Sequence, residues 1–206
     1  MRSWHRVFSV AIIAAALSGC AKTSLTNLWK IQDSATPLQS ILVVSLERDE
    51  DLRRAWEDAL SAEFQANGVM ARPAYSLFPT ALPDSQQVVS VSRRDGYDGV
   101  IVTHRISATQ TGKFDSDYAK TAPGGHNDYW RGWYHTHFTK ASLSPPFDEG
   151  KARFQVDLAN TAGAGTLLWT GSTTEIDPRD EEKVSKEVCG ELVTELTRQD
   201  LVAKRR

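Results

Sequence analysis

Residues 41–74, ILVVSLERDEDLRRAWEDALSAEFQANGVMARPA, alternate a strand pattern, a helix pattern and a second strand pattern. The aliphatic run Ile41–Val44 is typical of a buried strand. Acids at Glu47–Asp51 suit the positive end of a helix, and Asn67-Gly68 suits its end. Between them, apolar residues recur at helical spacing: Leu52, Trp56, Ala59, Leu60 and Phe64. Val69–Ala74 indicates the second strand, so the segment predicts a β-α-β unit.

The following segments extend this unit. Prolines interrupt the chain after the second strand, and Asp84 or Ser85 can cap a short helix that ends at Asp95-Gly96. The apolar run within Gly99–Ile106 then predicts a third strand. The result is a β-α-β-α-β unit.

The C-terminal part predicts a hairpin followed by a helix. Phe154, Val156 and Leu158 alternate with polar residues, as in a half-buried strand, and Leu167 and Trp169 begin its partner. In the last helix, Asp177 suits the cap position and Pro178 the first helical position. The apolar stripe of this helix is Val184, Val188, Leu192 and Leu196.

Residues 112–150 differ in composition from both flanks. They contain Gly124-Gly125, Pro145-Pro146 and the aromatic run Tyr129–Phe138. Because glycine and proline interrupt regular structure, we expect a long loop or extended hairpin here. The predicted fold class is therefore α/β (α+β): the β-α-β-α-β unit, an aromatic-rich insertion, a β-hairpin and a C-terminal helix, all on a mixed sheet. Trp56 and Trp169 are expected in its core.

The N-terminus has the pattern of a secretory leader. Met1–Arg6 carries two arginines and no acid, and Val7–Leu17 is almost purely apolar. That stretch is about half the roughly 20 residues that a membrane-spanning helix needs. The following Leu17-Ser18-Gly19-Cys20 resembles the bacterial lipobox, in which the cysteine receives a diacylglycerol and becomes the first residue of the mature chain. An ordinary secretory leader with a chance cysteine is the alternative.

The lipobox predicts how the chain is divided and where it resides. Residues 1–19 are expected to be a signal peptide, 20–39 a lipidated N-terminus and tether, and 40–206 a single domain. Ala21, where the enterobacterial sorting rule places Asp for inner-membrane retention, points to the outer membrane with the domain facing the periplasm. This sorting argument applies to a Gram-negative host.

Charge and cysteine usage narrow the function classes. Removal of residues 1–19 lowers Lys+Arg from 24 to 22 against 26 Asp+Glu, so the formal net charge moves from −2 to −4. A mildly acidic chain is not expected to bind nucleic acid, because proteins that bind nucleic acid normally present a basic surface.

With Cys20 lipidated, Cys189 has no partner for an intrachain disulfide, and we expect a buried structural thiol.

A family resemblance rests on the order of these core patterns. The patterns run from Ile41–Val44 through Asn67-Gly68-Val69, Tyr97–Val102 and Leu167–Ser172 to Asp177-Pro178. Together they resemble small uncharacterised envelope lipoproteins of Gram-negative bacteria. That domain is similar in outline to the α/β modules of the curli-secretion lipoprotein, the lipoprotein activator of penicillin-binding proteins and the N-terminal domain of the Tol-system periplasmic protein. The resemblance implies a fold and a compartment, and no catalytic residue.

One group of side chains suits metal chemistry. The common catalytic motifs, such as G-x-S-x-G and H-E-x-x-H, are absent from the sequence. On a strand, His135 and His137 would share a face and could both bind Zn²⁺ or Cu²⁺, with His126 or Asp128 as a third ligand. Exposed hairpin histidines without a metal are the other interpretation, and we expect no cofactor.

The aromatic run also allows two interpretations. Tyr and Trp are enriched where proteins meet partners, so a docking patch is one. Its residues would be Tyr129, Trp130, Arg131, Trp133, Tyr134 and Phe138. The other is a second small core packed over the sheet.

The leading functional hypothesis is therefore a noncatalytic binding or envelope-assembly module anchored to the outer membrane. Its partner would be another envelope protein or the cell wall. A metal-binding protein or metal-assisted hydrolase that uses His126, Asp128, His135 and His137 is the alternative, and a purely structural envelope component is a third.

Overall fold

A computed structural model describes residues 25–30, 36–106, 128–143, 152–177, 179–180 and 183–204 of the chain. The predicted leader, the lipobox with Cys20, His126 and Pro178 lie outside these described residues. Within them, no helix is both long and apolar enough to cross a membrane.

A six-stranded mixed sheet forms the centre of the fold, in the order β1-β6-β5-β4-β2-β3. Strand β2 pairs in parallel with β3 and β4, whereas β4, β5, β6 and β1 pair antiparallel in turn. The strands are β1 (Leu25–Lys30), β2 (Ser40–Ser45), β3 (Met70–Pro73), β4 (Gly99–Ile106), β5 (Arg153–Asn160) and β6 (Leu167–Thr173). The predicted mixed α/β fold is confirmed.

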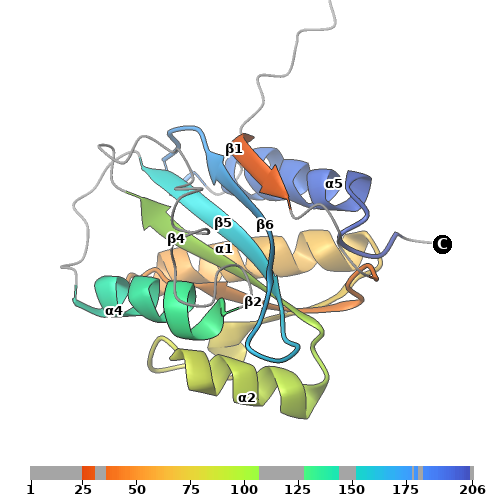
Figure 1. The fold of residues 1–206 in the computed structure, drawn as a ribbon. Coiled ribbons are helices and arrows are strands. Elements are labelled where there is room, and N and C mark those ends of the chain that lie inside the picture. Colours follow the sequence, from red (N-terminus) through yellow and green to blue (C-terminus); the bar gives the residue numbers. More distant parts are fainter. Residues whose placement is uncertain are drawn as a thin grey trace, which may run out of the picture.

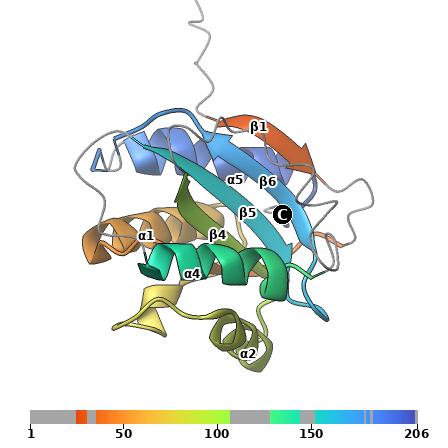
Figure 2. The ribbon, with the colours of Figure 1, turned by 60° about the vertical axis from the view of Figure 1, so that its left-hand side comes forward.

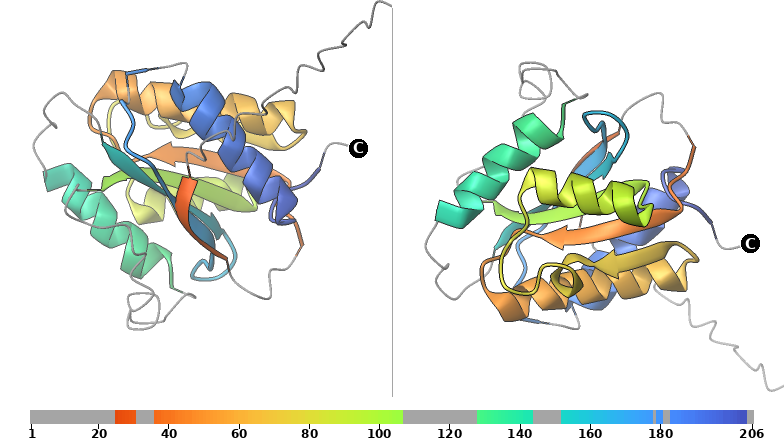
Figure 3. Two further views of the ribbon diagram at one scale, coloured as in Figure 1. Left: turned by 90° about the horizontal axis from the view of Figure 1, so that it is seen from above. Right: turned by 90° about the horizontal axis from the view of Figure 1, so that it is seen from below.

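Helices cover both faces of this sheet (Figures 1 and 3). Helix α1 and the η4–α5 segment pack on one face, and α2, η3 and α4 pack on the other. The helices are α1 (Glu50–Ala66), α2 (Ser85–Asp95), α4 (His135–Leu143) and α5 (Gly190–Arg198), the π-helical turns are η3 (Trp130–Tyr134) and η4 (Lys183–Cys189), and a short 3-10 turn is η1 (Ala74–Ser76). The order β2, α1, β3, α2, β4 confirms the predicted β-α-β-α-β unit.

The central strand shows why the sheet needs both helical layers. Ile41 and Val43 of β2 join the core under α1, and Leu42 and Val44 join the core under α2. Successive side chains of a strand point to opposite faces, so an all-aliphatic strand must be covered on both sides. The strand is buried along its whole length.

Local capping signals fix where the first two helices begin and end. Asp49 caps α1 by accepting the backbone N–H groups of Asp51 and Leu52. Asp84 forms a capping box with Gln87 at the start of α2, and Gly96 ends that helix in the left-handed conformation. Asp84 is thus the cap residue, of the two that the sequence offered.

The predicted tether contains a strand. Within the range expected to be a tether, 20–39, Leu25–Lys30 forms β1 and pairs antiparallel with β6 at the edge of the sheet. Leu38 also bridges Val202 near the C-terminus. Long-range pairing decides this assignment, because the short polar segment carries little strand signal of its own.

Two further predictions change in detail. The C-terminal helical segment begins at Lys183, whose N–H is accepted by Asp180, while Asp177 accepts the N–H of Arg179 instead. The prediction of a loop or extended hairpin for 112–150 is wrong for its described part, because Trp130–Leu143 is helical. Trp56, Trp169 and the Cys189 thiol are fully buried, as expected.

Candidate functional site

The aromatic run forms a helix with two stripes. Residues four apart lie on the same side of a helix. Tyr129, Trp133 and His137 make the first stripe, and Trp130, Tyr134 and Phe138 make the second. Each stripe packs against a different part of the fold.

The first stripe is a stack of rings against the sheet. The Tyr129 and Trp133 ring centroids lie 5.3 Å apart, and those of Trp133 and His137 lie 3.7 Å apart. His104 of β4 meets this stack edge-on, with its ring centroid 4.9 Å from that of Trp133 and 4.4 Å from that of His137. The stack therefore joins α4 to the middle of the sheet.

The second stripe closes the space between the sheet and α2. The Tyr134 hydroxyl donates a hydrogen bond to the Pro83 carbonyl, 2.9 Å away, just before α2. Trp130 lies against the β5–β6 turn at Gly165, where a Cβ would overlap the indole Nε1. Gly165 also has a φ of +83°, so this turn requires glycine for two independent reasons.

Burial decides between the two interpretations of the aromatic run. Tyr129, Trp130, Trp133 and Tyr134 are buried and Phe138 is half-buried. The interpretation as a second core is confirmed for the four buried rings. Of the six residues of the predicted docking patch, Arg131 is the exposed one.

The helix also separates the two histidines of the predicted metal site. Residues two apart on a helix lie about 200° apart around its axis, so the shared face expected on a strand is wrong. His137 is turned inward, with Nδ1 3.0 Å from the Trp133 carbonyl oxygen, whereas His135 is exposed. Among the described residues, Asp128 included, no three His, Cys, Asp or Glu side chains could hold one metal ion.

A groove of about 790 Å³ lies between α2 and the η3–α4 segment. The right-hand view of Figure 3 shows these helices side by side beneath the sheet. The groove is lined by Ser85, Gln86, Val89, Ser90, Arg93, Trp130, Arg131, His135, Gly163 and Ala164. The β5–β6 turn supplies the last two residues.

The charge of this groove is one-sided. Arg93, Arg131 and His135 line it, and no Asp or Glu among the described residues does. The Arg93 guanidinium donates to the Gly163 carbonyl, which holds it beside the turn. Within the described part of the chain, no carboxylate forms an ion pair with these three side chains. The groove therefore favours an anionic ligand.

A second, smaller pocket of about 430 Å³ lies where β2 ends and α1 begins. Its charges are mixed, because Glu47 and Glu50 line it together with Arg48 and Arg53. Arg53 donates to the carbonyls of Ala81 and Pro79, and Glu47 forms a buried ion pair with Arg105 at 3.3 Å. These contacts fix the surrounding loops and give the pocket no preferred ligand charge.

Two buried carboxyl groups lie near these sites. Burial raises the pKa of Glu57 on α1 to about 7, although its carboxylate accepts the backbone N–H groups of Ser45 (3.0 Å) and Tyr75 (2.6 Å). Burial likewise raises the pKa of Asp157 on β5 to about 7, partly offset by hydrogen bonds from Thr170 and Gln155. No sequence motif marks either carboxyl group as part of a site.

The pKa values of the two histidines that face the sheet are lowered instead of raised. Burial lowers the pKa of His104 well below its usual value, and the nearby His137 and Lys140 lower it further. Burial also lowers the pKa of His137 to about 4, opposed by its contact with the Trp133 carbonyl. Both imidazoles are therefore neutral at pH 7.

Comparison with known proteins gives only distant likenesses. No family model and no curated protein matches this chain. Among solved structures it is similar to a PelC dodecamer from Paraburkholderia phytofirmans in space group C2, at 12% identity, 88% coverage of this chain, 99% of that chain and a TM-score of 0.46. A second PelC dodecamer from the same organism, in space group P6, gives 10% identity, 86% and 98% coverage and a TM-score of 0.44.

These values are too low to carry an argument about this chain. The neighbours are PelC and not the lipoproteins named in the sequence analysis, so that resemblance stays an expectation.

Proposed function

We propose that the protein is an outer-membrane lipoprotein, anchored through Cys20, whose periplasmic domain binds a partner noncatalytically through the α2–α4 groove. The observation that carries the proposal is the groove itself, where the described lining combines Arg93, Arg131 and His135 and includes no acidic side chain. An exposed surface with one sign of charge suits recognition of an oppositely charged partner.

The position of the groove agrees with an anchor at Cys20. That residue precedes β1 by five positions, and five residues span at most about 18 Å, so a lipidated Cys20 would hold the β1 end near the bilayer. Helix α2 lies at the opposite end of the molecule from β1 (Figures 1 and 2). The groove would therefore face away from the membrane, toward other envelope components.

The lining of the groove supports binding more than catalysis. Covalent catalysis needs a nucleophile within hydrogen-bond reach of a base that a third group orients. Ser85, Ser90 and His135 line the groove, yet no hydrogen bond joins His135 to either serine among the described residues. In the part of the chain that the structure describes, no acid lines the groove to orient the imidazole.

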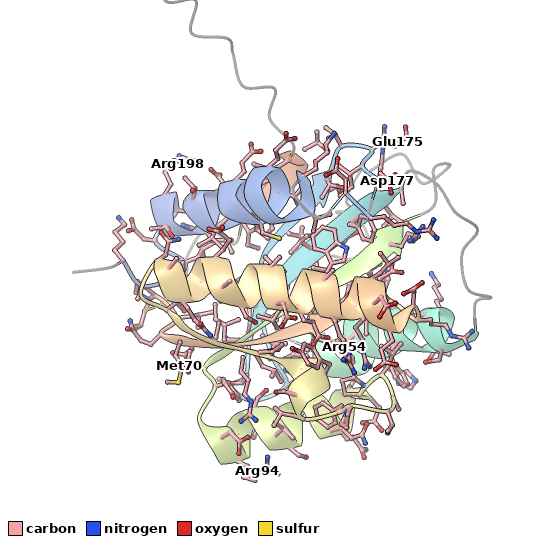
Figure 4. All side chains as sticks on the ribbon, turned by 180° about the vertical axis from the view of Figure 1, so that it is seen from behind. Arg54, Met70, Arg94, Glu175, Asp177 and Arg198 are labelled. Atoms are coloured by element: carbon pink, nitrogen blue, oxygen red, sulfur yellow. The ribbon has the colours of Figure 1, made fainter. Side chains whose placement is uncertain are left out.

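Site-specific photocrosslinking in living cells tests this proposal. A photoreactive residue replaces exposed Ser90 in the groove, and Met70 on the edge strand β3, 65% exposed, is the matched control. Figure 4 shows Met70 at the opposite side of the fold from α4. We expect Ser90 to give a discrete envelope adduct that Met70 does not give.

The anchor is tested in the same cells. The Cys20→Ala variant should lose labelling by an alkyne-tagged fatty acid and lose the adduct, because the domain leaves the membrane. Equal adduct patterns from Ser90 and Met70 would reject the groove as the docking site, and fatty-acid labelling that survives Cys20→Ala would reject the anchor.

A further inference from the structure

The shape of the α2–α4 groove suits an extended chain. Ser85, Val89 and Arg93 line it at successive turns of α2, with Gln86 and Ser90 beside them. The rise from Ser85 to Arg93 is about 12 Å along the helix. A fully extended peptide rises about 3.3 Å per residue, so the groove accommodates roughly four peptide residues.

The groove combines apolar and positively charged surface. Val89 and Trp130 contribute apolar side chains to its lining, and Arg93 of α2 and Arg131 of η3 lie on the two segments that flank it. A ligand with carboxylates on both sides of an apolar group matches this arrangement.

The acids at the two ends of α2 do not pair with the arginines of the groove. Asp84 at the start of α2 accepts the N–H of Gln87 as a cap, and Asp95 at its end pairs with Arg94. Arg94 points away from the groove, where Figure 4 shows it at the outer surface of α2. The positive charge of Arg93 and Arg131 is therefore available to a partner.

We infer that the groove binds an extended acidic segment of a partner protein, with its carboxylates at Arg93 and Arg131 and an apolar side chain against Val89. This inference rests on the proposed function and names the chemistry of its partner. A bilayer with anionic lipids fits less well, because β1 and the lipid anchor lie at the other end of the domain. The apolar side chains in the lining favour a peptide over a uniformly charged polyanion.

The test measures fluorescence anisotropy with the full-length lipidated protein in detergent. The probe is a short labelled peptide of alternating glutamate and leucine, and the comparison peptide has glutamine in place of glutamate. We expect only the acidic peptide to bind, with an affinity that falls as salt is added. Combined Arg93→Glu and Arg131→Glu should weaken binding by roughly tenfold or more.

Arg94→Glu is the matched control, because it makes the same charge change on the same helix outside the groove. It should leave the affinity within about twofold of the parent protein. Arg131→Glu alone breaks no hydrogen bond or ion pair among the described residues, so it keeps the test informative if the Arg93 variant folds poorly. A drop in affinity with Arg131→Glu, at an unchanged melting temperature, supports the inference.

Three results would overturn it. They are equal binding of the glutamine peptide, an equal loss with Arg94→Glu, or Arg93-dependent binding of dextran sulfate without binding of the acidic peptide. A Ser90 crosslink to an envelope partner alongside any of these results would leave the proposed function standing and reject the acidic-peptide chemistry.

Discussion

Asp157 and Glu57 are buried carboxyl groups with a pKa near 7, yet their partners differ in a way that mutation can expose. Asp157 meets the side chains of Thr170 and Gln155, which can reorient, whereas Glu57 accepts two backbone N–H groups, which cannot. We expect Asp157→Asn to raise the free energy of unfolding at pH 8 by about 1–3 kcal/mol, because a buried charge disappears.

Glu57→Gln is the contrasting control. Its amide NH₂ would face a backbone N–H, so we expect it to lower the free energy of unfolding by about 1–3 kcal/mol at the same pH. Urea denaturation of both variants at pH 8 makes the comparison. Destabilisation by both to the same extent would show that the reorienting side chains around Asp157 do not matter.

The sequence predicts the burial of some side chains and not of others. Trp56 is predicted as buried because it lies in the apolar stripe of its helix pattern, and Cys189 because it follows Val188 of such a stripe, which are local signals. Glu57 is buried only because Ser45 and Tyr75, from other elements, bring their N–H groups to it. No pattern around residue 57 contains that information.

In the η3–α4 segment, one ring contacts three others. Trp133 stacks on Tyr129 and His137 and meets His104 of the sheet. We expect Trp133→Ala to lower the free energy of unfolding by about 3–5 kcal/mol, as for other buried large-to-small changes. Urea denaturation measures it, with Arg131→Ala on the exposed side expected to stay within about 0.5 kcal/mol. A loss below about 1 kcal/mol for Trp133→Ala would mean that the stack does not hold the segment.

The same element shows how a sequence pattern can be present and still be misread. Tyr129, Trp133 and His137 recur every four residues, as do Trp130, Tyr134 and Phe138, which is helical spacing. Aromatic residues also favour strands, and the nearby Gly124-Gly125 and Pro145-Pro146 suggest irregular structure. The surfaces of β4 and α2 decide in favour of the helix, because they bury both stripes.

At the scale of the whole molecule, the sequence predicts the β-α-β-α-β unit and the mixed sheet, since each element carries its own periodicity. The sequence does not predict the groove. Its lining comes from residues 85–93, 130–135 and 163–164, which only the assembled fold brings together. The pairing of β1 with β6 likewise depends on contacts between residues far apart in the sequence.

Four of the buried titrating groups give the folded protein opposing responses to pH. The carboxyl groups of Asp157 and Glu57 have a raised pKa, so between about pH 4.5 and 7 the unfolded chain has lost protons that the folded chain keeps, and stability falls as pH rises. His104 and His137 have a lowered pKa, so below about pH 6.5 the unfolded chain binds protons that the folded chain does not bind. For these two groups, the stability of the fold therefore rises with pH. The two trends offset each other.

Removing one group at a time should reveal this compensation. We expect the free energy of unfolding of the parent protein to vary little between pH 4.5 and 6.5. His137→Phe keeps a ring on Trp133 but removes one histidine, so its stability should fall as pH rises, whereas Asp157→Asn should make stability rise with pH. Urea titrations across that range measure the three slopes. Parallel curves for the three proteins would mean that His137 and Asp157 titrate in the folded state near their ordinary pKa values, and slopes of the reverse sign would mean that folding shifts these two pKa values in the opposite directions.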